Sequence, residues 1–241
     1  MSLRSKSKYV AAARPASNAG VTLYCSETQV GCHWIRLVLA EKSVTGARME
    51  LQGPGQTSED LATLNPAQTL PTLTDRETVI HPARLIAEFL DERYPHPPMM
   101  PPEAAVRARL RMFMSLLESD WLPMIRDVEK GTPAVAKKAR KQLAEQVAAH
   151  ARLFPSRGWF LGLEYGLMDC AITALLWRMA TLKLQLPANS DPIRRYAERA
   201  FARPAFSESL VGAQRPSPAK AAASKNARAA AKKVGRKPSD Q

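Results

Sequence analysis

The fold is decided by Thr69-Leu-Pro-Thr-Leu-Thr74, followed by the polar triplet Asp75-Arg-Glu77 and the short run Thr78-Val-Ile80. Two β-prone runs separated by a polar triplet predict a β-hairpin. Pro71 has no N–H to donate to a strand ladder, so it is expected at the start of a strand, where a cis X–Pro bond can be accommodated. The sequence on either side of the hairpin indicates the other strands and helices of the same domain.

Strand and helix patterns alternate on both sides of this hairpin. The run Val21–Tyr24 is β-prone, whereas the apolar side chains that follow it recur at the spacing of one helix face. Ser58 is a helix-capping residue type, and Asn65-Pro66 ends the short helix that it opens. The predicted elements are strands at 21–24 and 47–51 and helices at 30–42, 59–64 and 83–94, which with the hairpin give the order βαβαββα.

A proline-rich segment divides the chain in two. Five of the eight residues from 95 to 102 are proline, so this segment is expected to be an extended linker and not a helix. Beyond it the sequence is almost entirely helical in pattern. The predicted helices cover 103–130 with a bend near Pro123, 134–154 behind Thr132-Pro133, 167–186, and 192–202 behind Ser190.

The charge of the chain is concentrated at its two ends. The 241 residues include 35 Lys and Arg against 22 Asp and Glu, a net charge of +13, of which residues 1–20 carry +4 and residues 215–241 carry +7. The second of these ends has one large apolar residue, Val234, and cannot bury enough surface to offset the entropy lost on ordering. We therefore expect basic disordered tails at 1–20 and 213–241, around a nearly neutral folded part.

Composition also excludes several classes of protein. Apolar residues make up 45% of the chain, and no apolar run approaches the roughly 18 residues that span a bilayer. Cys25, Cys32 and Cys170 form no close C-x-x-C pair, which argues against a disulfide scaffold and a structural zinc site and favours a reducing, cytosolic setting. The first twenty residues have too short an apolar stretch for a secretory signal, although a transit peptide would share their composition.

Six segments carry a family resemblance. They are Ile35-Arg-Leu-Val-Leu-Ala-Glu-Lys42, Leu64-Asn-Pro66, Leu70-Pro-Thr-Leu73, Glu88-Phe-Leu-Asp-Glu-Arg-Tyr-Pro-His-Pro-Pro98, and Asp169-Cys170 with Leu175-Leu-Trp-Arg178. From about Val21 to Leu210 the chain resembles the stringent starvation protein A family. The resemblance implies the glutathione S-transferase fold, with an α/β thioredoxin-like N-terminal domain over 21–94, the linker 95–102 and an all-α C-terminal domain over 103–212. It also implies a bacterial, cytoplasmic, non-enzymatic transcription regulator that associates with RNA polymerase and alters promoter use under starvation or stress.

The resemblance places the nucleophile position of a glutathione enzyme near Gln29. Such an enzyme needs a hydroxyl or thiol at the N-terminus of its first helix, where free N–H groups stabilise a thiolate, and neither Gln29 nor its next two neighbours has one. Cys25, Ser26 and Cys32 keep open the alternative of a glutathione-dependent transferase or thiol reductase. Cys32 is followed by His33, but neighbours in a helix point about 100° apart, so a direct nucleophile–base pair is not expected.

The second part of a glutathione site is replaced as well. Glutathione transferases usually place Glu-Ser before the last helix of the first domain, where the helix N-terminus holds a carboxylate. This chain has His81-Pro82 there, which removes both an acid and an N–H donor, and Pro71 is expected to keep a structural role. Gln29, Pro71, His81 and Pro82 are therefore predicted to be vestigial glutathione-site positions, with no catalytic residue, cofactor or metal.

The linker residues Pro95, His96, Pro97 and Pro98 are the predicted partner-binding site. In the family that the chain resembles, a Pro-His-Pro segment is implicated in contact with the polymerase, and a preformed polyproline-like segment loses little entropy on binding. The resemblance implies RNA polymerase holoenzyme as the partner, through its sigma subunit, and a homodimer. The alternative is that the prolines only stiffen an inter-domain linker and His96 is solvated.

The C-terminal tail has a predicted role of its own. Spaced cations on a flexible Ala-rich chain bind polyanions without reading sequence, so we expect weak, non-specific DNA contact, with a simple solubility tail as the alternative. The residues concerned are Lys220, Lys225, Arg228, Lys232, Lys233, Arg236 and Lys237.

Three further groups are predicted to be structural. Gly166-Leu-Met-Asp169 corresponds to a helix capping box in which Asp169 bonds back to the cap N–H, while glycine loses the forward bond at a cost of roughly a few tenths of a kcal/mol. The remaining groups are Trp121, Trp159 and Trp177, expected in the core or a dimer interface, and Arg107, Arg109 and Arg111, expected on a solvated face.

Overall fold

The predicted hairpin is formed by β3 (Thr72–Asp75) and β4 (Thr78–Ile80) in the computed structural model, which describes residues 20–56 and 58–214. The two strands are antiparallel, with Leu73 opposite Ile80. The Leu70–Pro71 bond is cis. The first strand starts after Pro71 and not at Thr69, because proline has no N–H for the ladder and the Asn65 side-chain amide holds the preceding turn through Thr69.

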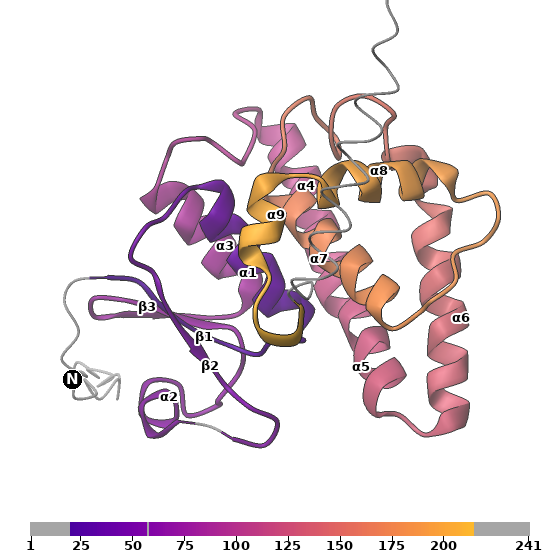
Figure 1. Ribbon diagram of the computed structural model, residues 1–241. Coiled ribbons are helices and arrows are strands. Elements are labelled where there is room, and N and C mark those ends of the chain that lie inside the picture. The colour runs from indigo at the N-terminus through magenta and orange to yellow at the C-terminus, as the bar shows by residue number, and fades with distance from the viewer. Residues whose placement is uncertain (1–19, 57, 215–241) are drawn as a thin grey trace, which may run out of the picture.

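The sheet has four strands in the order β2-β1-β3-β4. The central strand β1 (Thr22–Cys25) is parallel to β2 (Arg48–Leu51) and antiparallel to β3, and all four of its residues are buried. In Figure 1, α1 (Val30–Glu41) and α3 (Ala83–Arg93) lie between the sheet and the second half of the chain, whereas α2 (Glu59–Leu64) lies below the sheet. Ser58 caps α2 as predicted, accepting a hydrogen bond of 3.3 Å from Leu61 N.

The second half is helical, as predicted. Its α-helices are α4 (Ala104–Leu116), α5 (Leu122–Lys130), α6 (Pro133–Ala149), α7 (Leu167–Thr181), α8 (Asp191–Phe201) and α9 (Pro204–Ser209). A π-helical turn, Leu117–Trp121, joins α4 to α5, and 3-10 turns follow at Ala151–Leu153 and Gly212–Gln214. The fold is therefore the expected one, a thioredoxin-like half followed by an all-α half.

Several boundaries differ from the predicted ones. The bend expected near Pro123 is the π-helical turn that precedes it, because proline has no N–H for the carbonyl four residues earlier. The helix expected to reach 186 ends at Thr181, where Lys183 takes a left-handed φ of 55° and Leu184 N bonds back to Met179 O. Ser190 precedes α8, but its hydroxyl makes no capping bond. Helix α9 was not predicted.

Helix α1 is shared by the cores of both halves. Its residues from Val30 to Leu39 are all buried, and it packs against α3 of its own half and against α7 and α9 of the other (Figure 1). Trp121 belongs to the same hydrophobic core. Among the described residues, no helix has the length and hydropathy needed to cross a membrane. The predicted tails, including every cation assigned to DNA contact, lie outside the described residues except for positions 20, 213 and 214, so their disorder stays a prediction.

Candidate functional site

A buried ion pair holds the linker between the two halves. Lys42 directly follows α1, and its side chain has no exposed surface, with Nζ 2.6 Å from Asp91 Oδ1. The ammonium also donates to Tyr94 O at 2.7 Å and to Pro97 O at 2.8 Å. A lysine is rarely buried unless its charge is paired, and here each of its contacts goes to α3 or to the linker.

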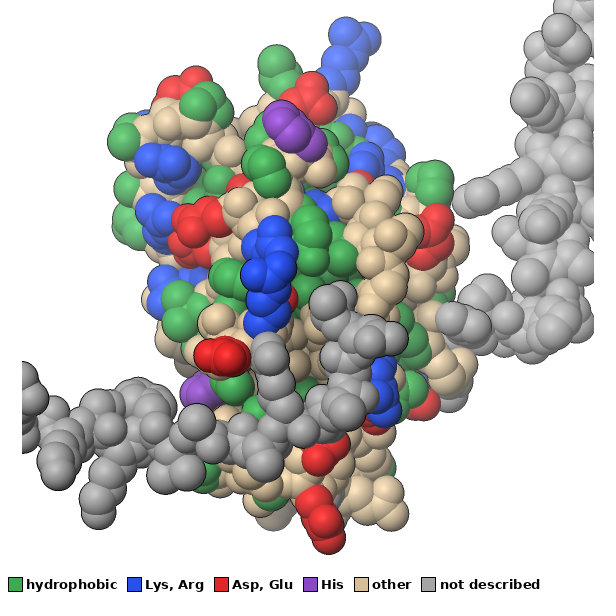
Figure 2. All heavy atoms as spheres, turned by 90° about the vertical axis from the view of Figure 1, so that its left-hand side faces the viewer, with side chains coloured by type: hydrophobic (Ala, Val, Ile, Leu, Met, Phe, Trp, Pro, Cys, Tyr) green, Lys and Arg blue, Asp and Glu red, His purple; other side chains and the backbone are tan. Residues whose placement is uncertain are grey.

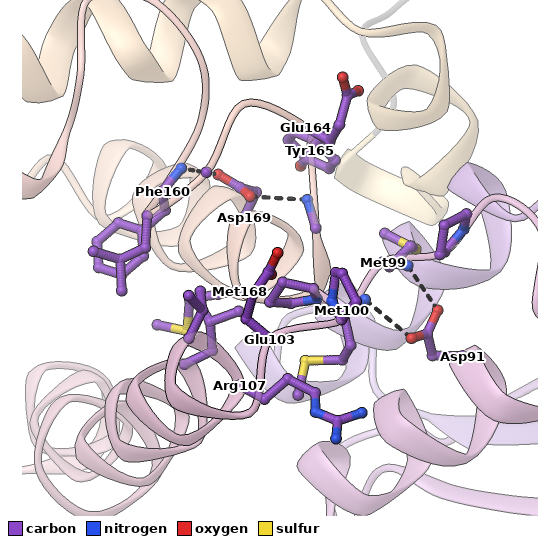
Figure 3. A pocket seen from close by; sticks show the side chains of 18 of the residues that line it. Asp91, Met99, Met100, Glu103, Arg107, Phe160, Glu164, Tyr165, Met168 and Asp169 are labelled. Carbon is purple, nitrogen blue, oxygen red and sulfur yellow. Dashed lines mark hydrogen bonds between the residues drawn. The ribbon is translucent and has the colours of Figure 1, made fainter.

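The Asp91 carboxylate fixes the other end of the same segment. Its two oxygens accept hydrogen bonds from Met99 N at 2.9 Å and Met100 N at 3.0 Å (Figure 3). Lys42 and Asp91 together therefore bond to the main chain at four positions between Tyr94 and Met100. This pair is not apparent from the sequence, because Lys42 has the pattern of an ordinary residue after a helix.

The four predicted partner-binding residues form one exposed strip, which we call the linker ridge, residues 95–98. Pro95, His96, Pro97 and Pro98 are all exposed, and the His96–Pro97 bond is cis. On one side of the ridge is a shallow hollow of about 400 Å³, lined by Pro95 and His96 together with residues 42–45, Arg93 and Tyr94. The side chains of the ridge are therefore exposed to solvent, while its main chain accepts a hydrogen bond from the buried Lys42 at Pro97 O.

A deeper pocket of about 800 Å³ lies on the other side of the ridge, between the linker, the start of α4 and the loop before α7. Its buried lining is apolar except for Asp169, with Met99, Leu110, Phe160 and Met168 among the apolar residues. Glu103, Arg107 and Glu164 add charge to the lining (Figure 3). All three residues of the predicted arginine cluster, Arg107, Arg109 and Arg111, are exposed. Arg107 and Arg111 also line this pocket, and Arg111 bonds to Glu88 at 2.8 Å.

Asp169 has the predicted capping role beside this pocket. Its carboxylate accepts hydrogen bonds from Gly166 N at 2.9 Å and Phe160 N at 2.8 Å, and from the Tyr196 hydroxyl. Burial raises the pKa of Asp169 to about 6, against the opposing effect of these bonds. The three donors belong to the loop before α7, to the residue that caps α7, and to α8. The carboxylate therefore joins parts of the fold to one another. Trp159 and Trp177 are partly buried and pack against the core.

A second cleft, of about 600 Å³, opens where α1 and α3 begin. Gln29, Pro71 and Pro82 line it, so the structure brings three of the four predicted vestigial positions together. His81 is exposed and is not among the lining residues. An ideal Cβ on Gly31, also in the lining, would lie 3.3 Å from Pro71 Cδ. Helix α1 therefore begins close against Pro71.

The two thiols near this cleft are buried, and burial raises the pKa of each. Cys32 Sγ accepts a hydrogen bond of 3.1 Å from Ser26 N, and burial raises the pKa of Cys32 to about 12. Burial likewise raises the pKa of Cys25. His33 does not face Cys32, as expected from helix geometry, and lies 2.9 Å from Ser209 Oγ through its Nε2. Burial, with the Arg36 charge, lowers the pKa of His33 to about 3, so its ring is a poor proton acceptor at neutral pH.

Ser26 is the hydroxyl that reaches the cleft. It lines the wall, and its Oγ accepts a hydrogen bond of 3.3 Å from Thr28 N. Among residues 20–56 and 58–214, no histidine or carboxylate bonds to this hydroxyl to activate it, and no group of three His, Cys, Asp or Glu side chains is placed to hold a metal ion. The described cleft residues thus contain no activated nucleophile of their own, whereas a hydroxyl that only stabilises a ligand's thiolate needs no such base, so Ser26 is the residue on which the transferase alternative rests.

Comparisons with known proteins agree with this description. Residues 32–93 match the family model of the glutathione S-transferase N-terminal domain, and residues 94–204 match that of the C-terminal domain. The theta class glutathione S-transferase of Xanthomonas axonopodis pv. citri, solved with glutathione bound, has a TM-score of 0.73 to this chain at 18% identity, covering 82% of this chain and all of that one. This likeness shows the fold.

Relatives found by sequence show to which family of that fold the chain belongs. The stringent starvation protein A homolog of Pasteurella multocida is 44% identical over 191 residues, which is 79% of this chain and 90% of the relative. The homolog of Coxiella burnetii is 36% identical, over 79% of this chain and 91% of the relative. Identity at this level over nearly the whole of each relative, together with the glutathione S-transferase fold, shows that the chain belongs to the stringent starvation protein A family.

Proposed function

We propose that this protein is a non-enzymatic transcription regulator of the bacterial cytoplasm. It binds RNA polymerase holoenzyme through the sigma subunit, with the linker ridge in the contact, and alters promoter use under starvation or stress. Family membership supports the class of function. The geometry of the ridge supports its location.

The observation that carries the proposal is the fixed main chain beneath the exposed ridge. Lys42 Nζ bonds to Tyr94 O and Pro97 O, and Asp91 bonds to Met99 N and Met100 N. A segment already held in one conformation loses little entropy when a partner binds it. His96 in turn offers a hydrogen-bond donor and an acceptor to that partner.

We expect specific side-chain contacts, and not long-range electrostatic attraction, to direct the binding of the polymerase to the ridge. Figure 2 shows the side of the molecule that carries the sheet, where positive and negative side chains are interspersed among hydrophobic ones. Residues 21–214, between the two basic ends, carry a net charge of only about +2. Mixed charge of this kind favours recognition through specific contacts over long-range attraction.

The test is capture of purified RNA polymerase holoenzyme by the immobilised full chain. His96→Ala should reduce capture by at least about tenfold, which corresponds to the loss of roughly 1.4 kcal/mol of contact. His81→Ala is the matched control, because His81 is also exposed but lies at the start of α3. Equal capture by both variants would remove the ridge from the contact. Turnover of glutathione with an electrophile, lost in Cys32→Ala or Ser26→Ala, would favour the transferase or reductase alternative.

A homodimer is part of the same proposal. Arg111 of α4 bonds to Glu88 of α3 at 2.8 Å, so the two helices are joined at this point. One residue of each helix close to that bond, Met112 at 71% and Leu85 at 46%, is an exposed apolar side chain. Met112→Glu should therefore shift the protein from dimer to monomer in analytical ultracentrifugation, whereas Val135→Glu, an exposed apolar position on α6, should not.

The basic tail is assigned a separate, weaker role in non-specific DNA contact. Truncation after Gln214 should leave polymerase capture in place and should lower the affinity for non-specific DNA and its salt dependence. Loss of polymerase capture would instead make the tail the main contact.

A further inference from the structure

The π-helical turn between α4 and α5 directs an acid into the cleft. Leu122 N bonds to Leu117 O five residues earlier, in place of the usual four. Pro123 follows directly and has no N–H to continue the α-helical pattern. Glu118 lies in this turn and is part of the cleft lining, while Ser119 and Asp120 are exposed. Turns of this kind are rare and often occur at functional sites.

The Glu118 carboxylate lies at the N-terminus of α3, in the other half of the protein. Oε1 accepts a hydrogen bond of 3.3 Å from Arg84 N, and Oε2 is 3.4 Å from Arg84 Nε. Helix α3 has no side-chain cap at Pro82 and no acid in its first turn. The free N–H groups of a helix start attract a negative charge, and here the charge comes from a residue 34 positions away.

The surroundings of Glu118 favour anions. The start of α1 at Gln29 also faces the cleft and also has no side-chain cap. Arg126 and Lys130 of α5 add two cations to the lining. The other acid in the lining, Glu129, bonds to Arg178 at 2.6 Å and is therefore already paired.

We propose that Glu118 is an internal occupant of this cleft. Its carboxylate takes the place at the start of α3 that a carboxylate of a small peptide-like ligand would need, so the folded chain excludes such ligands. The proposal goes beyond the docking function and does not depend on it, because the linker ridge is formed by other residues. It adds an obstacle to glutathione binding beside the replaced anchor at His81-Pro82.

Removing the Glu118 side chain should open the cleft. The probe is S-methylglutathione, a peptide with two carboxylates and a blocked thiol, titrated calorimetrically into the full chain. Wild type should show no saturable binding in the low millimolar range, and Glu118→Ala should bind at least about tenfold more tightly. Glu118→Gln keeps the size of the side chain and removes its charge, so it should show a smaller gain. Glu129→Gln changes an acid of the same cleft that is paired elsewhere, and should behave as wild type.

Two results would overturn the proposal. One is wild-type binding as tight as that of Glu118→Ala, and the other is the absence of any gain in Glu118→Ala when its circular dichroism and melting curve show a folded protein. If the alanine variant does not fold, the near-isosteric Glu118→Gln decides alone, and no gain there has the same meaning. Polymerase capture is measured for each variant as well. A variant that binds no peptide but still captures polymerase contradicts only the role of Glu118, and loss of capture in every protein, wild type included, contradicts only the proposed function.

Discussion

Arg36 and Ser209 lie 173 positions apart, yet Arg36 Nε donates a hydrogen bond of 2.8 Å to the Ser209 carbonyl oxygen. The other guanidinium nitrogens donate to Ser26 O at 2.9 Å, Glu27 O at 3.2 Å and the Gln214 side-chain oxygen at 2.8 Å. Arg36 is 2% exposed. One buried cation therefore ties the first helix to the loop before it and to the last described segment of the chain.

Replacing Arg36 by lysine should destabilise the protein although the charge is kept. An ammonium cannot reproduce the planar fork that serves these separate oxygens, and buried carbonyls left without a donor lower stability. We expect Arg36→Lys to lower the free energy of unfolding by about 3 kcal/mol, measured by urea denaturation. Arg195→Lys, at an exposed position of α8, should change it by less than about 0.5 kcal/mol. A similar small change at Arg36 would contradict this interpretation.

Lys42→Met should release the linker ridge. Methionine fills a similar volume but leaves the Asp91 carboxylate and the carbonyls of Tyr94 and Pro97 without their cation. The expected loss is about 3 kcal/mol in the free energy of unfolding, with faster amide hydrogen exchange at Met99 and Met100. Lys141→Met, whose side chain is 77% exposed, is the control. Unchanged exchange at both amides would show that Asp91 fixes the linker alone.

Gly166→Ser should be destabilising, although serine is normally the better helix cap. From the sequence, glycine costs a few tenths of a kcal/mol here, but an ideal Cβ at this position would lie 2.7 Å from Met99 O. The same carbonyl accepts a hydrogen bond of 3.0 Å from Leu167 N, so it is not free to move away. We expect a loss of about 1–3 kcal/mol, read from thermal melts.

Gly162→Ser is the matched control for that variant. Its Cβ would meet no neighbour closer than 3.9 Å, so its melting temperature should stay near that of the wild type. A gain of stability in Gly166→Ser would mean that the loop carrying Met99 adjusts without penalty.

His33 should make stability fall in mild acid. The Ser209 hydroxyl donates to Phe206 O, so its oxygen accepts from His33 Nε2, and the neutral ring carries its hydrogen on Nε2. Because burial lowers the pKa of folded His33 to about 3, from 6.5, only the unfolded chain takes up this proton between those values. Stability is therefore lost as pH falls through that window, by about 2 kcal/mol between pH 7 and pH 5.

The measurement is the urea midpoint of wild type and His33→Gln at both pH values. The variant should lose less stability than wild type on acidification, while His81→Gln should follow wild type. Comparing the variants removes the opposing contribution of Asp169, whose raised pKa makes stability fall as pH rises. Equal losses in wild type and His33→Gln would exclude His33 as the source.

The sequence predicted the elements better than the contacts between them. Hydrophobic spacing and the proline at position 71 were enough for the sheet and for most helices, because both signals act over a few residues. Helix α9 was missed although Pro204 stands at its first position, since six residues leave little periodicity to detect. The exposure of the ridge also follows from its composition, because prolines cannot join a helix or a central strand.

The pairs that shape the two candidate sites were not predictable in the same way. Lys42 and Asp91 are 49 positions apart, and Glu118, which contacts Arg84 34 positions away, lies in a π-helical turn that sequence periodicity does not reveal. Each pair joins elements that the sequence pattern treats as independent. The cleft and the ridge therefore required the three-dimensional arrangement.

The burial of α1 has a consequence for engineering. If the chain is cut at the linker, the apolar side chains of α1 that α7 and α9 cover become exposed to water. We expect isolated residues 20–94 to aggregate instead of folding, and a chimera with the helical half of a distant transferase to fail unless residues facing α1 are exchanged with it. The whole chain should accordingly unfold in a single calorimetric transition. During evolution, substitutions in α1 should be accompanied by substitutions in the residues of both halves that pack against it, and exchange of one half for that of another protein should be rare.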